Sequence, residues 1–365
     1  MSIDSPDRYD ERLQQNCDDQ TARFASCGLT LSALHQLLRN EWFIATERVQ
    51  GMQHRDGLFY LNASDSIPNI RKQDFTGQSV LTVGGSGDFP QTFLDLGAAK
   101  VDVFDHSALA CFMNELKYLA LQLLPYDEYT KLFSPKNPRE KTKLFNKEIF
   151  DKIKEYLTPQ AREFLEAITK PAYEKFFVFD PVTAGCKGPL LAREKIGKKE
   201  TGAMYPHSSS QPAYESLQQK ARTVPSGIFY GDIGSLPVDF AAYDYIYISN
   251  IGYRTPQIME AVRSLLLRGA KRVGFTWQFI GYDNMDEFKI SDRFFIDPSI
   301  GTAVDKASLN RDHSHVKDAE LILMTRDGAQ LLPGAEFTYK GMRMRMIGYD
   351  YNVLVPCHAE AIGFA

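Results

Sequence analysis

The residues best placed to bind a ligand lie where a short apolar run, Val-Leu-Thr-Val at 80–83, gives way to small residues. The turn that follows, which we call the glycine turn, consists of Gly84, Gly85, Ser86, Gly87 and Asp88. Small residues let a backbone approach a ligand closely. A second apolar run ends at Asp105, about 20 residues further on, where a carboxylate can accept hydrogen bonds from two ribose hydroxyls. The pattern predicts binding of a cofactor that contains adenosine.

The residue at position 90 decides which cofactor is expected. A dinucleotide fingerprint would place its third glycine there, but the chain has Pro90. A proline suits the first turn of a helix, and Gly97 then marks the end of that helix. This favours S-adenosylmethionine over NAD. A glycine-rich turn that binds nothing is the alternative reading, because a lone glycine motif is weak evidence.

Further polar residues follow other expected strands, and ligands of open α/β sheets bind at the carboxyl ends of strands. The candidates are Asp105-His106, Asp232-Ile233, and a last group made of Ser249, Asn250, Ile251, Gly252 and Tyr253. We expect Asp105 to hold ribose, Asp232 to hold the adenine amino group, and the last group to form the reacting centre. Taken singly, Asp232 could instead cap a turn, and Ser249 with Asn250 could satisfy backbone groups.

The elements that must position these residues indicate an α/β fold with a doubly wound, mostly parallel sheet. Strands are expected at 79–84, 101–105, 227–232, 245–249 and 271–277, with helices at 90–96, 107–124 and 255–268. Strand-like segments at 320–325 and 341–355 would complete the sheet in antiparallel fashion. Residues 1–75 are expected to form a helical cap on a cofactor-binding domain, 76–365. An insertion at 125–225 contains an irregular stretch at 185–212, either a lid or a surface excursion.

Composition limits the class of protein. The 365 residues are 44% hydrophobic and 24% charged, which is typical of a soluble globular protein. A net charge of −4 argues against a broad basic surface for nucleic acid. Without an 18-residue apolar run or an export signal, and with five scattered cysteines, the expected location is the cytoplasm. His207, His313 and His315 lack a third ligand at metal spacing, so no metal is expected. The expected partner is a small-molecule substrate, and the oligomeric state stays open.

Several of these segments resemble a known family. Residues 80–88, 101–105, the Asn-Glu-Leu-Lys of 114–117 and the segment 126–133 are similar to the S-adenosylmethionine-dependent 3-amino-3-carboxypropyltransferases related to betaine-lipid synthesis. The likeness covers about residues 75–135 and 243–253 and is poor elsewhere. It implies a class I methyltransferase fold and transfer of the aminocarboxypropyl arm with release of methylthioadenosine.

Positioning rather than acid–base chemistry would then select the reaction, because the sulfonium already activates three carbons. Tyr253, Asn250 and Ser249 are the candidate catalytic residues, with an aromatic face at Tyr253 to hold the positive sulfur. Tyr60 and Tyr205 are weaker candidates for that face. The acceptor stays open between a small amine or hydroxyl, a lipid, and the cofactor's own amine, which would close an azetidine-2-carboxylate ring. A methyltransferase and a non-catalytic cofactor-binding protein are further alternatives.

Overall fold

The computed structural model describes a set of separate ranges of the chain. These are residues 6–39, 59–60, 70–71, 73–85, 87–132, 146–168, 190–192, 210–249, 255–276, 336–339, 342–347 and 352–356. The chain divides into two compact units. Unit 1 comprises Met1–Ser64, Gly84–Asp95 and Val101–Leu236, and unit 2 comprises Asp65–Val83, Leu96–Lys100 and Pro237–Ala365.

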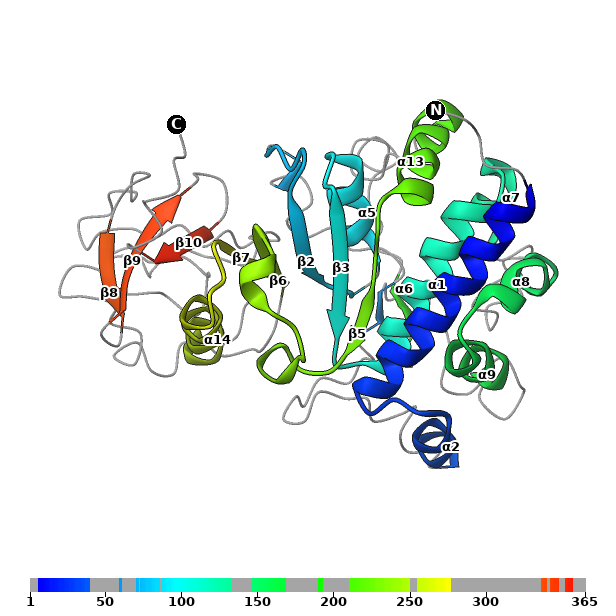
Figure 1. Cartoon of the computed structure of the whole chain (residues 1–365), viewed down its shortest axis with the longest axis horizontal. Helices are drawn as coiled ribbons and strands as arrows, with labels where there is room; N and C mark the ends of the chain where they lie inside the picture. Colours follow the sequence, from blue (N-terminus) through cyan, green and yellow to red (C-terminus); the bar gives the residue numbers. More distant parts are fainter. Residues whose placement is uncertain are drawn as a thin grey trace. The chain divides into compact units, whose positions relative to one another are not determined.

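Unit 1 is built around two parallel strands covered by helices (Figure 1). The strands are β3 (Lys100–Asp105) and β5 (Ile228–Tyr230), and they pair in the register Val103↔Ile228. The longer helices are α1 (Pro6–Ser26), α2 (Leu31–Arg39), α5 (Asp88–Asp95), α6 (Ala108–Leu123), α9 (Pro159–Ile168) and α13 (Gln211–Thr223). Shorter elements are β1 (Phe59–Tyr60), α7 (Tyr126–Leu132), α8 (Lys147–Ile153), η1 (Lys154–Tyr156), β4 (Leu190–Ala192) and η2 (Ile233–Ser235).

Helix α6 lies at the centre of unit 1, in contact with β5, α9 and α13. The centroid of its Phe112 ring lies 5.5 Å from the ring centroid of Phe24 of α1, in an edge-on arrangement, and 5.1 Å from that of Phe164 of α9. The helix begins where expected, because the Ser107 side chain accepts a hydrogen bond from the Ala110 amide at 3.1 Å. Strand β3, which ends at Asp105, is thus followed within two residues by a capped helix, and this helix packs on aromatic rings of α1 and α9.

A carboxylate of α6 also fixes the start of α9. Glu115 accepts hydrogen bonds from the Thr158 amide at 2.6 Å and from the Thr158 hydroxyl at 3.0 Å. The same hydroxyl accepts a hydrogen bond from Ala161, as a helix cap does. Helix α9 is therefore attached to α6 by a polar contact as well as by ring packing.

Helix α1 covers strand β5. Gln20 donates to the carbonyl of Ile228 at 2.7 Å, and the Ile228 amide donates back to the Gln20 side chain at 2.9 Å. In Figure 1 α1 runs alongside β5, in agreement with the contacts between the two elements. One side chain therefore satisfies both backbone groups of a strand residue.

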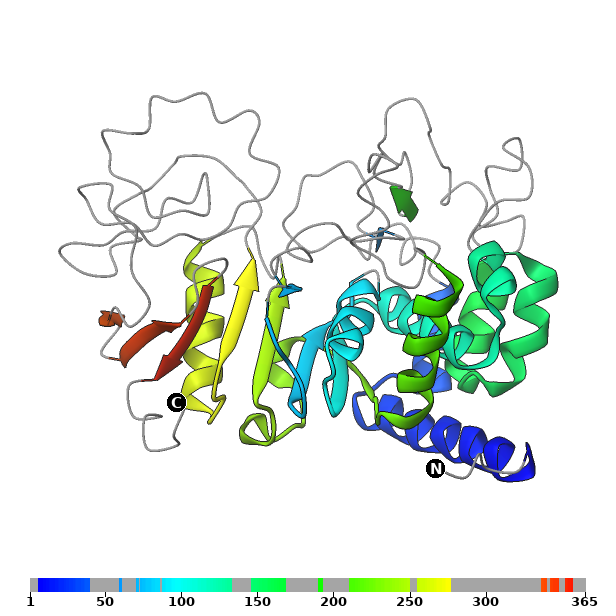
Figure 2. The same cartoon turned by 90° about the horizontal axis from the view of Figure 1, so that it is seen from above.

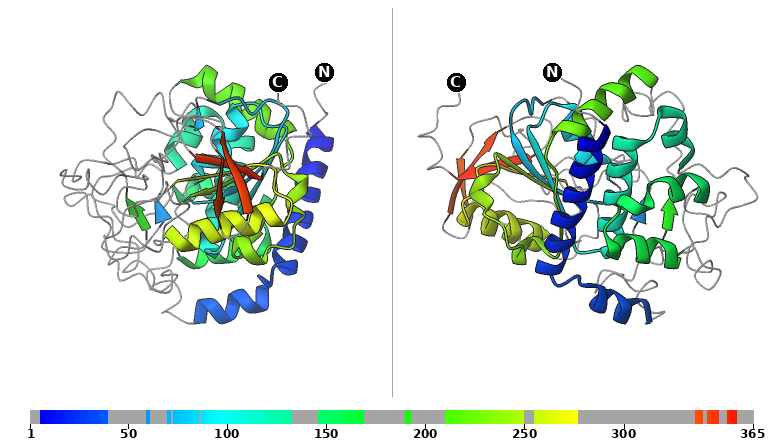
Figure 3. Two further views of the ribbon diagram at one scale, coloured as in Figure 1. Left: turned by 90° about the vertical axis from the view of Figure 1, so that its left-hand side faces the viewer. Right: turned by 45° about the vertical axis from the view of Figure 1, so that its right-hand side comes forward.

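Unit 2 carries the remaining strands in the order β2-β6-β7-β10-β9-β8. Their bounds are Ser79–Val83 for β2, Tyr245–Ser249 for β6, Val273–Thr276 for β7, Glu336–Tyr339 for β8, Met342–Ile347 for β9 and Asn352–Pro356 for β10. Strands β2, β6 and β7 are parallel, and β10, β9 and β8 continue antiparallel (Figure 2). The short helix η3 (Phe240–Ala242) precedes β6, and α14 (Thr255–Leu267) contacts β7 and β10 (Figure 3).

The predicted α/β class with a mostly parallel sheet and flanking helices is confirmed. The antiparallel completion expected over 341–355 is found as β9 and β10, while the segment 320–325 lies outside the described residues. Helix α13 and strand β8 were not among the elements expected from the sequence. In the part of the chain that the structure describes, no helix combines the length and the apolar character needed to cross a membrane.

Candidate functional site

The glycine turn and Asp105 are joined by direct hydrogen bonds. Oδ2 of Asp105 accepts from the Gly85 amide at 2.9 Å, and Oδ1 accepts from the Ser107 amide at 2.9 Å. The Gly84 amide is held separately, because it donates to the carbonyl of Phe104 at 2.8 Å. The two sequence features singled out for adenosine binding thus form one structure.

Burial dominates the electrostatics of Asp105, whose side chain is 7% exposed. Removal from water raises the pKa of the carboxyl, while the nearby His106 and the amides of Ser107, Gly85 and His106 act in the opposite direction. His106 itself is exposed, with Nδ1 3.6 Å from Oδ1 of Asp105. Further hydroxyl donors at this carboxylate would stabilise its charged form.

Two glycines of the turn are required by close packing against α6. A Cβ at Gly84 would lie 2.9 Å from Nδ2 of Asn114, and one at Gly87 would lie 3.0 Å from Cδ of Lys117. Gly87 also has a φ of +87°, a conformation that other residues adopt at a cost. The backbone of the turn therefore rests directly on Asn114 and Lys117.

Asn114 and Lys117 share one face of α6 and are both almost fully buried. Nδ2 of Asn114 donates to the carbonyls of Ala110 at 2.8 Å and Gly85 at 3.4 Å, which ties the helix to the turn. Oδ1 of Asn114 is buried and has no hydrogen-bond partner among the residues that are described. Such an acceptor is uncommon, because nearly all buried polar atoms are hydrogen-bonded.

Lys117 makes a buried ion pair with Asp88. The ammonium lies 3.5 Å from Oδ1 of Asp88, whose side chain is only 1% exposed. Burial lowers the pKa of the Lys117 ammonium, and the Asp88 carboxylate opposes that effect. Asp88 was predicted to bind the cofactor directly. In the structure the Asp88 carboxylate accepts a hydrogen bond from Lys117. Asp88 is connected with the turn through its backbone position as the first residue of α5.

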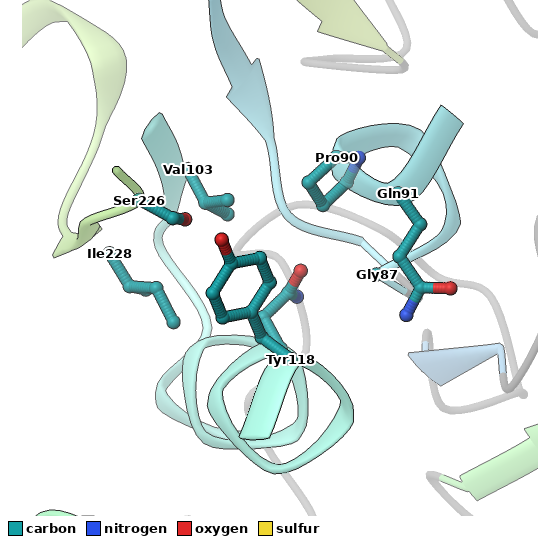
Figure 4. Close-up of a pocket in the computed structure, with 8 residues that line it drawn as sticks. Gly87, Pro90, Gln91, Val103, Tyr118, Ser226 and Ile228 are labelled. Atoms are coloured by element: carbon teal, nitrogen blue, oxygen red, sulfur yellow. The ribbon is translucent and has the colours of Figure 1, made fainter. Parts of the chain in front are cut away.

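A small cavity adjoins this cluster. Gly87, Pro90 and Gln91 line one side of it, Val103, Ser226 and Ile228 the other, and the Tyr118 ring stands between them (Figure 4). Asn114 also lines the cavity, whose free volume of about 10 Å³ matches roughly one water molecule. The cavity is too small for a cofactor, and its lining is mainly apolar, with Gly87 of the turn on one side.

The end of β5 joins the same structure. The Gly231 amide donates to the carbonyl of Asp105 at 2.8 Å, which places Asp232 and Ile233 next to the end of β3. Asp232 is exposed, and its Oδ1 accepts from the Gly234 amide at 2.8 Å, so it caps the turn that begins η2. Ile233 is buried. Three of the four predicted polar groups therefore lie together in unit 1.

The fourth predicted group is described only in part. Ser249 is the last residue of β6 and pairs with Thr276 of β7, and its side chain is not described. Tyr60 lies in β1, and its side chain is likewise not described. Residues outside the described part of the chain are Ser86, Asn250, Ile251, Gly252, Tyr253, Tyr205, His207, His313 and His315. Within the described ranges, no group of three or more His, Cys, Asp or Glu residues could hold a metal ion.

Sequence reasoning did not identify the part that Lys117 plays. It appeared only as one residue in the segment 114–117 of the helix expected at 107–124. The available signal was the three-residue spacing between Asn114 and Lys117, which puts both on one face of a helix.

No protein-family model matches the sequence, and no curated protein matches it. Among solved structures, the chain is similar to the rRNA methyltransferase aviRa from Streptomyces viridochromogenes, with 12% identity, coverage of 62% of this chain and 82% of that chain, and a TM-score of 0.27. A likeness this distant carries no argument about ligand or reaction.

Proposed function

We propose that this protein is an enzyme that binds S-adenosylmethionine at the glycine turn and transfers its 3-amino-3-carboxypropyl group to a small acceptor. The observation that carries the proposal is the hydrogen bond between the Gly85 amide and the Asp105 carboxylate. It joins a glycine turn to an acid at the end of β3, a combination of features that is typical of adenosine-binding sites.

The residues present fit such a ligand. Asp105 offers carboxylate oxygens to the two ribose hydroxyls, and the exposed Asp232 offers an acceptor to the adenine amino group. The tight packing at Gly84 and Gly87 fixes the path of the turn, whose backbone can then approach the amino-acid arm. His106 and Ile233 border the adenosine, while Gly85 and Ser86 complete the turn.

The bound cofactor supplies a sulfonium that activates the carbons attached to it. The chain's own residues select one carbon by aligning an acceptor with it. In aminocarboxypropyl transfer, the acceptor would form a bond to the γ-carbon while the bond from that carbon to sulfur breaks. The electron pair of that bond stays on the sulfur of the departing methylthioadenosine, and the acceptor's proton is released to solvent. Tyr253, Asn250 and Ser249 are proposed to line this reacting centre, with the Tyr253 ring against the positive sulfur.

Product analysis tests the proposal directly. The purified full chain is incubated with S-adenosylmethionine, with and without small amines and hydroxyl compounds, and the products are identified by mass spectrometry. We expect methylthioadenosine and an acceptor heavier by one aminocarboxypropyl group. Formation of S-adenosylhomocysteine would replace the proposal by methyl transfer.

Two further outcomes distinguish the remaining alternatives. Azetidine-2-carboxylate formed in the absence of any acceptor indicates cyclisation by the cofactor's own amine. Tight binding without consumption of the cofactor over hours indicates a non-catalytic binding protein. A lipid acceptor is tested by adding diacylglycerol in detergent micelles to the same reaction.

A further inference from the structure

We propose that Lys117 gives the glycine turn its selectivity for a ligand that carries a carboxylate. Lys117 neutralises Asp88 from beneath the turn, so that the amino-terminal end of α5 stays attractive to an anion. This inference deepens the proposed function and rests on it, because it requires an adenosine ligand whose amino-acid arm reaches the turn.

The position of Asp88 creates the need for a counter-charge. Asp88 is the first residue of α5, and the amino-terminal end of a helix carries a partial positive charge that favours anions. The Asp88 carboxylate is buried at that end and is poorly screened by solvent. Left alone, it would cancel the field of the helix and repel an arriving carboxylate.

Lys117 removes that negative charge. Its ammonium is buried with the carboxylate, 3.5 Å from Oδ1, and the pair has no net charge whichever partner holds the proton. Burying an ion pair adds little stability compared with apolar side chains of similar volume. Stability therefore does not account for this ion pair. We assign it another function, which is to keep the electrostatic potential under the turn from becoming negative.

The glycine turn lies close enough to Lys117 to be affected by its charge. Its Gly87 backbone rests on the stem of Lys117, with a Cβ position only 3.0 Å from Cδ. The unpartnered Oδ1 of Asn114 lies 3.3 Å from that same Cβ position. A buried acceptor without a partner, aimed at the turn, is an independent sign that a polar group or a water arrives here.

Two ligands that differ only in the carboxylate test the inference. Binding of S-adenosylmethionine and of decarboxylated S-adenosylmethionine to the full chain is measured by calorimetry, with methylthioadenosine as the ligand that lacks the arm. For Lys117→Met we expect S-adenosylmethionine to bind about tenfold more weakly. Decarboxylated S-adenosylmethionine and methylthioadenosine should change by less than about threefold or bind more tightly, because neither brings a negative charge to the turn.

A second substitution separates charge from shape. In Asp88→Asn/Lys117→Met the buried negative charge is gone as well, so the preference for the carboxylate ligand should return to within about threefold of the parent protein. Equal losses for all three ligands in Lys117→Met, or no recovery in the double variant, would overturn the inference.

The test holds even where Lys117→Met fails to fold. Asp88→Asn alone removes the negative charge beside Lys117 and also the carboxylate that opposes the lowering of the Lys117 pKa. At a pH low enough for the Lys117 ammonium to keep its proton, this variant should raise the affinity for S-adenosylmethionine relative to its decarboxylated form, and a ratio that stays unchanged as the pH is lowered counts against the inference. If the parent protein binds none of the three ligands, the proposed function itself has failed. That result is distinct from binding without carboxylate selectivity.

Discussion

Asp105 and Gly85, twenty positions apart, are linked by a hydrogen bond of 2.9 Å from the backbone amide to Oδ2 of the carboxylate. The same carboxylate accepts from Ser107, so it organises both the glycine turn and the start of α6. A residue proposed to hold ribose therefore also shapes the surface on which the rest of the ligand would lie.

Replacing Asp105 should affect every ligand that contains the ribose. For Asp105→Ala we expect the affinities for S-adenosylmethionine and methylthioadenosine to fall alike, by about ten- to a hundredfold, because both lose a charged acceptor and an ordered turn. Titration calorimetry measures both. Asp102→Asn, a buried change on the same strand, is the control for general loss of stability. Unchanged curves for both ligands would refute the role of Asp105.

Gly87→Ala tests the packing between the turn and Lys117. The new Cβ would stand 3.0 Å from the buried Lys117 side chain at a φ of +87°, so we expect lower stability and weaker cofactor binding. Gly28 provides a matched control, since its φ is +83° and a Cβ there meets nothing within 4 Å. Gly28→Ala should cost about 1 kcal/mol of backbone strain, and Gly87→Ala about 1–2 kcal/mol more. Urea unfolding of both variants gives the comparison, and equal losses would contradict it.

Glu115 should make stability depend on pH. Burial raises the pKa of this carboxyl to about 7 from 4.5, against the hydrogen bonds from Thr158. A folded-state pKa above the unfolded one means that the native protein binds more protons between those values, so this contribution is complete below pH 4.5 and is lost as pH rises through 7. The loss is on the order of 1–3 kcal/mol.

Glu115→Gln provides the matching measurement. The amide keeps an acceptor for the Thr158 amide and cannot ionise, so the fall in urea midpoint between pH 5 and pH 8 should be smaller than in the parent protein. The same fall in both proteins would assign the pH dependence to other groups.

Tyr253 allows two roles to be separated by a pair of substitutions. If its ring holds the sulfonium, Tyr253→Phe keeps most of the attraction and Tyr253→Ala loses about 0.5–2 kcal/mol of it. If its hydroxyl orients an acceptor or the arm's amine, Phe should lower kcat almost as much as Ala does. Steady-state kinetics and cofactor affinity decide between them. Parent-level values in both variants would move the search to Tyr60 and the segment around Tyr205.

The sequence was most informative where chemistry and periodicity are local. The strand over 79–84 is found as β2 (Ser79–Val83), and the helix over 107–124 is found as α6 with Ser107 as its cap. Glycines, a proline and an apolar stripe define such elements within a few residues. The sequence placed the glycine turn and Asp105 at the ends of strands, and the structure adds the hydrogen bond that joins them.

Local sequence patterns did not predict the contacts that Asp88, Asn114 and Lys117 make beneath the turn. Lys117 resembles any solvated lysine on an amphipathic helix, and its partner Asp88 lies 29 residues away. Only the folded structure, which brings Asp88 at the start of α5 to 3.5 Å from the Lys117 ammonium, makes this lysine a buried counter-charge. The expected contact between Asp88 and the cofactor stays a prediction, and the structure adds the ion pair of Asp88 with Lys117.

The contact between Gln20 and Ile228 bears on how the protein avoids aggregation while it is being made. The Gln20 side chain occupies both hydrogen-bonding groups of Ile228 as an added strand would, and exposed strand edges recruit other chains. Gln20 precedes Ile228 by 208 residues, so a ribosome completes the covering helix long before it reaches β5. The helix that covers β5 is therefore available when the strand is made, and once α1 lies against β5 the two backbone groups of Ile228 are closed to a strand of another chain.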